Sequence, residues 1–183
     1  MTTPAAPSAA DPVPFSRIKI RVGALVFCES EVALIRRDRP DSVHYTPPGG
    51  NVEPGEDLEA ALWRELAEEL DLRPDQAGSP ELLWVVDQRV SRPGPTPPPR
   101  KLHLIHRLHV TPEVRETLAA EEYDEQPGGG YEVGVVEWVD HRRTADLPIF
   151  PLIGPALAAL PDPHAVVADA ALPAVTDDNY VWV

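Results

Sequence analysis

Three glutamates in the middle of the chain have a spacing that suits metal chemistry. Glu65, Glu68 and Glu69 stand at positions i, i+3 and i+4, so in a helix their carboxylates would project from one side toward a common point. Like charges at this spacing repel each other, and helix propensity offers no reason for them. A hard cation such as Mg²⁺ or Mn²⁺ offers one, because it prefers carboxylate and carbonyl oxygens. The alternative is a solvated acidic surface, which is how most charge runs are used.

The residues around these glutamates predict the helix that would carry them. Pro54 and Gly55 turn the chain, and Asp57 is a candidate N-cap. An apolar stripe follows at four-residue intervals, formed by Leu58, Leu62, Leu66 and Leu70 with Ala61 and Trp63 beside them. Arg64 precedes Glu65 directly and is placed to hold its carboxylate in a bidentate pair.

Residues 49–72, GGNVEPGEDLEAALWRELAEELDL, follow a specific motif. Five residues separate Gly50 from Glu56, and seven residues separate Glu56 from Arg64. After Arg64 come Glu65, the aliphatic Leu66, one further residue and the pair Glu68 and Glu69. This string resembles the Nudix box of the Nudix (MutT-type) hydrolases. One position departs, because the family has glycine where this chain has Asp71. Aspartate reaches the left-handed conformation at modest cost, so we interpret Asp71 as a tolerated helix cap.

The resemblance implies a fold and a metal site. The fold is α/β, a Nudix-type α/β/α sandwich in which a mixed, mostly antiparallel sheet lies between the box helix and a C-terminal helix. Glu68 and Glu69 would bind Mg²⁺, for which Mn²⁺ could substitute, and Glu65 would be either a further ligand or the base that activates water. The catalytic group implied is Glu65, Glu68 and the neighbouring Arg64.

The resemblance also assigns roles within the turn that precedes the helix. Arg64 would orient Glu65, and Glu56 would brace the turn together with Gly50. The carbonyl of Gly49 would coordinate metal, as the first glycine of this pair does in the family.

A further glutamate outside the motif binds metal in many Nudix enzymes, from just before the strand that ends near a tryptophan. We expect Glu132 in this role because of its distance from Trp138. Glu122 and Glu125 are rivals, and all three would otherwise be surface residues.

Two kinds of residue before the motif are candidates for substrate binding. Arg37 and Arg39 follow a predicted strand, where basic residues of the family often meet substrate phosphates; the alternative is surface charge at a strand end. Tyr45 could stack on a base, or it could pack against the sheet.

The function implied is Mg²⁺-dependent hydrolysis of a phosphoanhydride bond in a nucleoside diphosphate linked to another group. A nucleoside triphosphate is favoured as substrate, because the marks of family members that act on other substrates are not seen near residues 88–90. An ADP-ribose or nucleotide-sugar pyrophosphatase is the alternative enzyme. A non-catalytic ligand-binding or sensor module with the Nudix fold is the alternative of another class.

The rest of the chain predicts the elements that would position this motif. Strands are expected at residues 15–27, 32–36, 82–90, 101–110 and 132–139, loops at 91–100 and 111–131, a helical turn at 116–121 and a short helix at 151–160. Along 101–110 the three histidines alternate between the two faces of a strand, so we do not expect them to form a metal site.

Length and composition favour one domain with two extensions. Of the 183 residues, we assign 1–14 to a disordered tail, 15–160 to the Nudix domain and 161–183 to an extension whose apolar end could add a strand, cover the cleft or meet another subunit. A net charge of −14 argues against nucleic-acid and membrane surfaces, so the expected partner is a small nucleotide. The single cysteine, Cys28, allows no intramolecular disulfide and fits a cytoplasmic location. Homodimers are common in the family.

Overall fold

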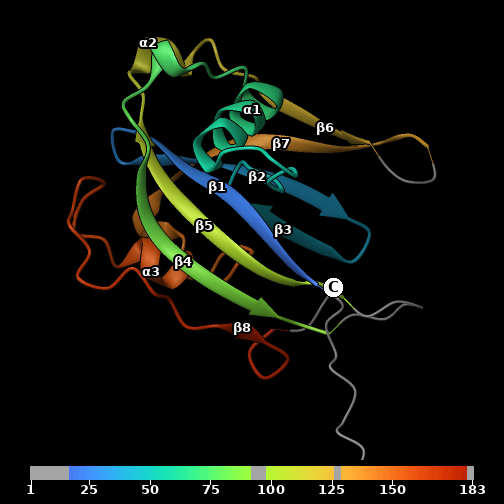
Figure 1. The fold of residues 1–183 in the computed structure, drawn as a ribbon. Helices are drawn as coiled ribbons and strands as arrows, with labels where there is room; N and C mark the ends of the chain where they lie inside the picture. Colours follow the sequence, from blue (N-terminus) through green and yellow to red (C-terminus); the bar gives the residue numbers. More distant parts are fainter. Residues whose placement is uncertain (1–16, 92–97, 126–128, 181–183) are drawn as a thin grey trace, which may run out of the picture.

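The computed structural model describes residues 17–91, 98–125 and 129–180, so the predicted N-terminal tail lies outside it. One mixed sheet runs through the molecule, with α-helices on both of its faces (Figure 1). Its strands are β1 (Ile18–Cys28), β2 (Glu31–Arg39), β3 (Ser42–Thr46), β4 (Glu81–Arg89), β5 (Arg100–His109), β6 (Glu121–Glu125), β7 (Tyr131–Asp140) and β8 (Val175–Thr176). The helices are α1 (Leu58–Leu70), α2 (Pro112–Arg115) and α3 (Gly154–Ala158), with 3₁₀ turns at Pro74–Gln76 and His141–Arg143.

The strand order is β6-β7-β2-β1-β5-β4-β8, and β3 pairs with β2 beside this path. Neighbouring strands are antiparallel except for β1 with β5 and β4 with β8, which are parallel. The expected mixed, mostly antiparallel sheet is therefore confirmed. None of the described helices combines the length and apolar character that a membrane span requires.

The two faces of the sheet bury separate cores because side chains alternate along each strand. On β1, Val26 packs toward α1 with Leu62 and Leu66. Its neighbour Phe27 packs on the opposite face, where Leu157 of α3 also lies. Figure 1 shows α1 and α3 on opposite sides of the sheet, which confirms the α/β/α sandwich.

Helix α1 confirms most of what its pattern predicts. The stripe is buried from Leu62 onward, but Leu58 is 43% exposed and lies outside it, because the first turn projects beyond the edge of the sheet core. Asp57 occupies the N-cap position without a side-chain capping bond. Asp71 is the C-cap in the left-handed conformation, with φ 55° and its N–H bonded to the carbonyl of Ala67, so the reading of Asp71 as a tolerated cap is confirmed.

Strands β3, β6 and β8 were not predicted from the sequence, and the helical turn expected within 111–131 lies at another position. Residues 111–131 do not form a continuous loop, since they contain α2 and the edge strand β6. The helical turn lies at Pro112–Arg115, where Thr111 accepts a capping bond from Val114, and not at 116–121. Strand β6 has the sequence EEYDE, which lacks apolar alternation and is fixed by pairing with β7. Strand β3 is likewise defined by its pairing with β2.

The polar loop at 47–52 is built into the sheet and prepares the site. Strands β1 and β2 pair directly only from Val26 to Cys28. Farther along, Ala24 donates to the carbonyl of Pro48, and Val22 donates to the carbonyl of Gly50. The loop thus replaces β2 as the partner of β1, and it carries the start of the glycine-rich motif between the two strands.

Candidate active site

A cavity of about 490 Å³ lies against this loop, and its size is usual for a small-molecule site. Its charged lining comes from β1, the glycine turn, α1, β2, β5, β6 and β7 and includes Arg21, Arg37, Arg39, Glu65, Glu69, Lys101, Glu122, Asp124 and Glu132. Positive and negative side chains therefore face the same space. Such a mixture can bind an anionic substrate and a cation together.

A side chain added at either glycine of the turn beside the cavity would overlap neighbouring atoms. Gly49 has φ +140°, and a Cβ there would overlap the backbone carbonyl of Val22. A Cβ on Gly50 would overlap the carboxylate of Glu65. Gly49 therefore lets the turn lie close against β1, and Gly50 lets the carboxylate of Glu65 on α1 approach the turn.

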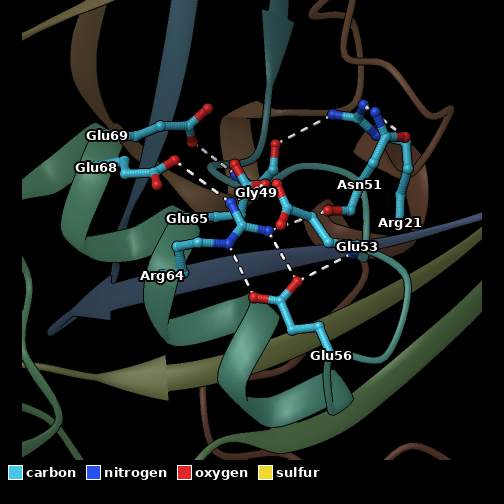
Figure 2. A network of polar contacts seen from close by, with 9 residues as sticks. All are labelled: Arg21, Gly49, Asn51, Glu53, Glu56, Arg64, Glu65, Glu68 and Glu69. Atoms are coloured by element: carbon cyan, nitrogen blue, oxygen red, sulfur yellow. Dashed lines mark hydrogen bonds and ion pairs between the residues drawn. The ribbon is translucent and has the colours of Figure 1, made fainter.

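Arg64 is the centre of a network that fixes the turn against α1 (Figure 2). Its Nε and Nη2 donate to the two oxygens of Glu56 at 2.8 and 3.0 Å. Its Nη1 donates to Oε1 of Glu65 at 2.8 Å, and Nη2 also reaches the carbonyl of Asn51 at 3.1 Å. Glu56 in turn accepts the backbone N–H of Glu53 at 3.0 Å. The hydrogen bonds that Arg64 donates to Glu56 raise the already high pKa of Arg64 further. The same hydrogen bonds hold the pKa of Glu56 below its ordinary value.

The three glutamates of the motif do not lie in equivalent surroundings. Glu69 is partly buried and accepts the N–H of Gly49 at 2.6 Å. Burial raises the pKa of Glu69 to about 8, and the nearby carboxylates of Glu122 and Glu65 raise it as well. Glu68 is 60% exposed, pairs with Arg64 at 3.4 Å and does not line the cavity. Glu65 and Glu69 are thus brought together in the cavity, and Glu68 lies at its outer side.

Arg21 is a site residue that the sequence reading missed. It lies partly buried near Glu65 and Glu69, and its Nη2 donates to the carbonyl of Gly49 at 3.1 Å (Figure 2). Burial is the largest influence on Arg21 and lowers its pKa, and the two glutamates oppose that effect. In sequence it is one of several basic residues in an amphipathic strand, and nothing local distinguishes it from a surface residue.

The carboxylates outside the motif are paired with arginines. Arg37 and Glu122 form a buried ion pair at 2.6 Å, in which both side chains are about one-tenth exposed or less. Glu132 accepts from Arg39 at 3.0 Å, and that bond lowers its pKa. Glu122 and Glu132 both line the cavity, and Glu122 is near enough to Glu69 to influence its pKa. The structure therefore favours Glu122 over the first choice, Glu132, as the carboxylate next to the motif. Glu125 is exposed and is not among the cavity residues.

Tyr45 does not reach the cavity, and its proposed stacking role is corrected. Its side chain is 6% exposed, packs in the core on the α3 face and donates its hydroxyl to Glu137 at 3.2 Å. The aromatic residues that do line the cavity are Phe150 and Tyr180. Both lie far downstream of the motif in the sequence and reach it only through the tertiary fold.

The donor set fits a hard divalent cation by its chemistry. Glu65, Glu69 and Glu122 offer carboxylate oxygens and Gly49 offers a carbonyl, which are the ligands that Mg²⁺ and Mn²⁺ prefer. The raised pKa of Glu69 means that added positive charge would stabilise its ionised form. Within the described ranges, no three His, Cys, Asp or Glu side chains already stand close enough to enclose an ion. The carboxylates would therefore have to converge further, from contacts now made to arginines and to a backbone N–H.

Comparison with known proteins identifies a matching family. A protein-family model described as NUDIX domain matches residues 17–158, which is most of the chain. No curated protein sequence gave a match.

Solved structures with the same fold come from several organisms. The mMutator MutT protein from Bacillus halodurans matches with a TM-score of 0.54 at 18% identity, over 88% of this chain and 93% of that one. An Ap4A hydrolase from C. elegans matches with a TM-score of 0.50 at 18% identity, over 76% of this chain and 92% of that one. At such low identity these likenesses show the fold alone.

Proposed function

The chain belongs to the NUDIX domain family and is a pyrophosphohydrolase, and we propose that it hydrolyses a phosphoanhydride bond of a nucleoside diphosphate derivative with Mg²⁺. The observation that carries this proposal is the cavity in which Glu65, Glu69 and Glu122 face several basic side chains. A diphosphate is anionic and binds divalent cations, so its recognition needs charges of both signs in one place.

Each charged group has a defined task in this proposal. Glu69 and the carbonyl of Gly49 would hold the cation, joined by Glu122 and, at the outer side, by Glu68, and Glu65 would be either a further ligand or the base that activates water. Bound divalent cations supply charge neutralisation to the diphosphate and acidify a water molecule. Glu65 is the candidate base: Arg64 engages its Oε1, so Oε2 is the atom we expect to accept the proton of the attacking water.

Basic residues around the cavity would receive the phosphates. Arg37 and Arg39 lie at the C-terminal end of β2, and they are the phosphate contacts expected from the sequence. Arg21 and Lys101 add two further positive charges from the neighbouring strands β1 and β5. Guanidinium groups bind phosphate oxygens in a bidentate manner, so these arginines can orient the diphosphate for in-line attack.

A nucleoside triphosphate remains the favoured substrate, and ADP-ribose or a nucleotide sugar is the alternative. A non-catalytic binding module is less consistent with the site, because a pure binder has no need for Glu65, Glu69, Glu56 and Arg64 to be retained together. The resemblance of fold does not decide the substrate, because specificity depends on the lining of the cavity.

The test is hydrolysis of a substrate panel by purified protein with Mg²⁺. The panel contains nucleoside triphosphates, oxidised dGTP, ADP-ribose, NADH, nucleotide sugars and diadenosine polyphosphates, and products are separated by chromatography. We expect a nucleoside monophosphate to be released from one class, and Glu69→Gln to reduce its formation by about a thousandfold or more. Turnover by Glu69→Gln at the wild-type rate would contradict the mechanism. No turnover by folded wild-type protein would favour the binding module.

A further inference from the structure

One end of the cavity is aromatic and is supplied by the C-terminal part of the chain. Phe150, Pro151 and Tyr180 line it. The rings of Phe150 and Tyr180 lie 4.8 Å apart between centroids, and Phe150 also contacts His103 edge-on at 5.8 Å. Such a group of rings presents an apolar wall inside a cavity whose other walls carry charge, and the rings of Phe150 and Tyr180 are tilted by 49° to each other.

The aromatic end connects to the carboxylates through the sheet. Arg21 of β1 and His103 of β5 are direct partners in the parallel register, so their side chains lie on the same face. Arg21 is adjacent to Glu65 and Glu69 on one side and to His103 on the other. The cavity therefore runs from the carboxylates past Arg21 and His103 to the Phe150–Tyr180 wall.

His103 contributes a neutral polar group to this end. Its Nε2 lies 2.8 Å from Oε1 of the buried Gln88. Burial lowers the pKa of His103 to about 3, so the ring is uncharged near neutral pH. The wall thus combines aromatic faces with an uncharged imidazole, an environment that suits a ring with polar edges better than it suits a phosphate.

Tyr180 is held in place by a hydrogen-bonded segment that lies beyond the residues matched by the family model. Strand β8 pairs with β4, and the N–H of Ser91 donates to Asp177 at 2.7 Å. A turn follows in which the N–H of Tyr180 donates to the carbonyl of Thr176 at 3.0 Å, and Asn179 bonds the backbone of the same turn. The family match ends at residue 158, so Tyr180 lies outside the matched residues, whereas Phe150 and Pro151 lie within them.

We propose that Tyr180, backed by Phe150, is a specificity-determining residue that stacks on the nucleobase of the substrate. This inference rests on the proposed function, because it assigns the nucleoside half of the substrate to the aromatic end while the diphosphate lies at the carboxylates. Stacking on an aromatic side chain recognises a base through its flat face and tolerates differences between bases. The C-terminal extension therefore completes the binding site from outside the conserved motif.

The test compares binding of reaction products with and without a base. Isothermal titration calorimetry measures the affinity of AMP, GMP, CMP, UMP and ribose 5-phosphate, each with Mg²⁺, for wild type, Tyr180→Ala and Tyr180→Phe. Tyr131→Ala, which removes a tyrosine that is 66% exposed and outside the cavity, is the matched control. Thermal unfolding of all variants checks that the fold is retained.

We expect Tyr180→Ala to lose tenfold or more in affinity for the nucleotides that bind wild type, while ribose 5-phosphate is unaffected. Tyr180→Phe should stay within about threefold of wild type because it keeps the ring. For the substrate found in the panel, KM should rise for Tyr180→Ala more than kcat falls.

Four results would overturn the inference. Wild-type affinity of Tyr180→Ala for every nucleotide, with turnover of the panel substrate intact, would refute the stacking role alone. An equal loss for ribose 5-phosphate would show a merely structural role, and tighter nucleotide binding would show that Tyr180 blocks the cavity. If wild type neither binds a nucleotide nor hydrolyses any panel member, the proposed function fails together with the stacking role.

Discussion

Glu69 and Arg21 lie in the same cavity with opposite charges, and both are partly buried. The sequence identified Glu69 because its spacing to Glu65 and to the preceding glycines follows a motif. It did not identify Arg21 or Phe150, because neither belongs to a local pattern, and for the apolar end that begins at Tyr180 it predicted a further strand, a cover for the cleft or a subunit contact. Their roles arise from strand register and from the packing of distant segments, which a single sequence does not display.

Glu68 shows the limit of a spacing argument at the scale of one residue. Helical geometry places Glu65, Glu68 and Glu69 on one side of α1, yet only two of them line the cavity. The helix side spans a wide arc, and Glu68 falls on its solvent edge, where it pairs with Arg64. Its role as a ligand remains a prediction.

The stability of the protein should depend on the protonation of His109. This ring stacks on Phe27 and on His164, and burial, followed by the neighbouring positive groups, lowers its pKa to about 4. Between pH 6.5 and 4 the unfolded chain therefore binds more protons at this position than the folded chain, so stability falls as pH falls. Glu81 is the acidic group that opposes this effect.

Replacement by an aromatic residue that does not titrate tests this dependence. The free energy of unfolding, measured in urea at pH 7 and at pH 5, should fall less between the two pH values for His109→Phe than for wild type. The difference should be about 1 kcal/mol, because partial exposure of the ring screens the effect. Equal decreases in the free energy of unfolding would contradict the assigned role of His109, because the two proteins contain the same carboxylates.

At the scale of elements, α1 and the turn before it were predictable because their signals are local. Residues 58–70 carry a helical period, and the glycines and Asp71 mark the ends of the motif. Strand β6 was not predictable, because its acidic sequence has no apolar alternation and β7 defines it by pairing. Its burial of Glu122 next to the motif was consequently hidden as well.

The glycine pair separates stability from activity. Gly49→Ala places a Cβ against the backbone of Val22 at a positive φ, so the turn and β1 must move apart. The free energy of unfolding should therefore fall by about 2 kcal/mol. Gly50→Ala meets only the movable carboxylate of Glu65. It should cost less than about 1 kcal/mol but reduce kcat roughly a hundredfold by displacing that carboxylate from its position.

Chemical denaturation and steady-state kinetics on the two variants check this pair of expectations. A Gly50→Ala enzyme with normal kcat would show that catalysis does not depend on the present position of the Glu65 carboxylate. A Gly49→Ala protein as stable as wild type would show that the turn can move without disturbing β1.

At the scale of the whole molecule, an acidic protein concentrates basic residues in one cavity. The net charge is −14, while the cavity is lined by Arg21, Arg37, Arg39 and Lys101. Overall composition argued against nucleic-acid and membrane surfaces, but it gave no indication of where the basic residues gather. The parallel strands β1 and β5 and the C-terminal end of β2 bring these basic residues beside the carboxylates of α1.

The central claim is that the cavity carboxylates hold a divalent cation, and Mn²⁺ binding measured by electron paramagnetic resonance tests it without reference to turnover. Wild type, Glu69→Gln, Glu68→Gln and the exposed control Glu59→Gln on the same helix are compared. We predict that Glu69→Gln weakens Mn²⁺ binding at least tenfold, that Glu68→Gln weakens it less and that Glu59→Gln binds like wild type. Wild-type Mn²⁺ affinity in Glu69→Gln would contradict the claim.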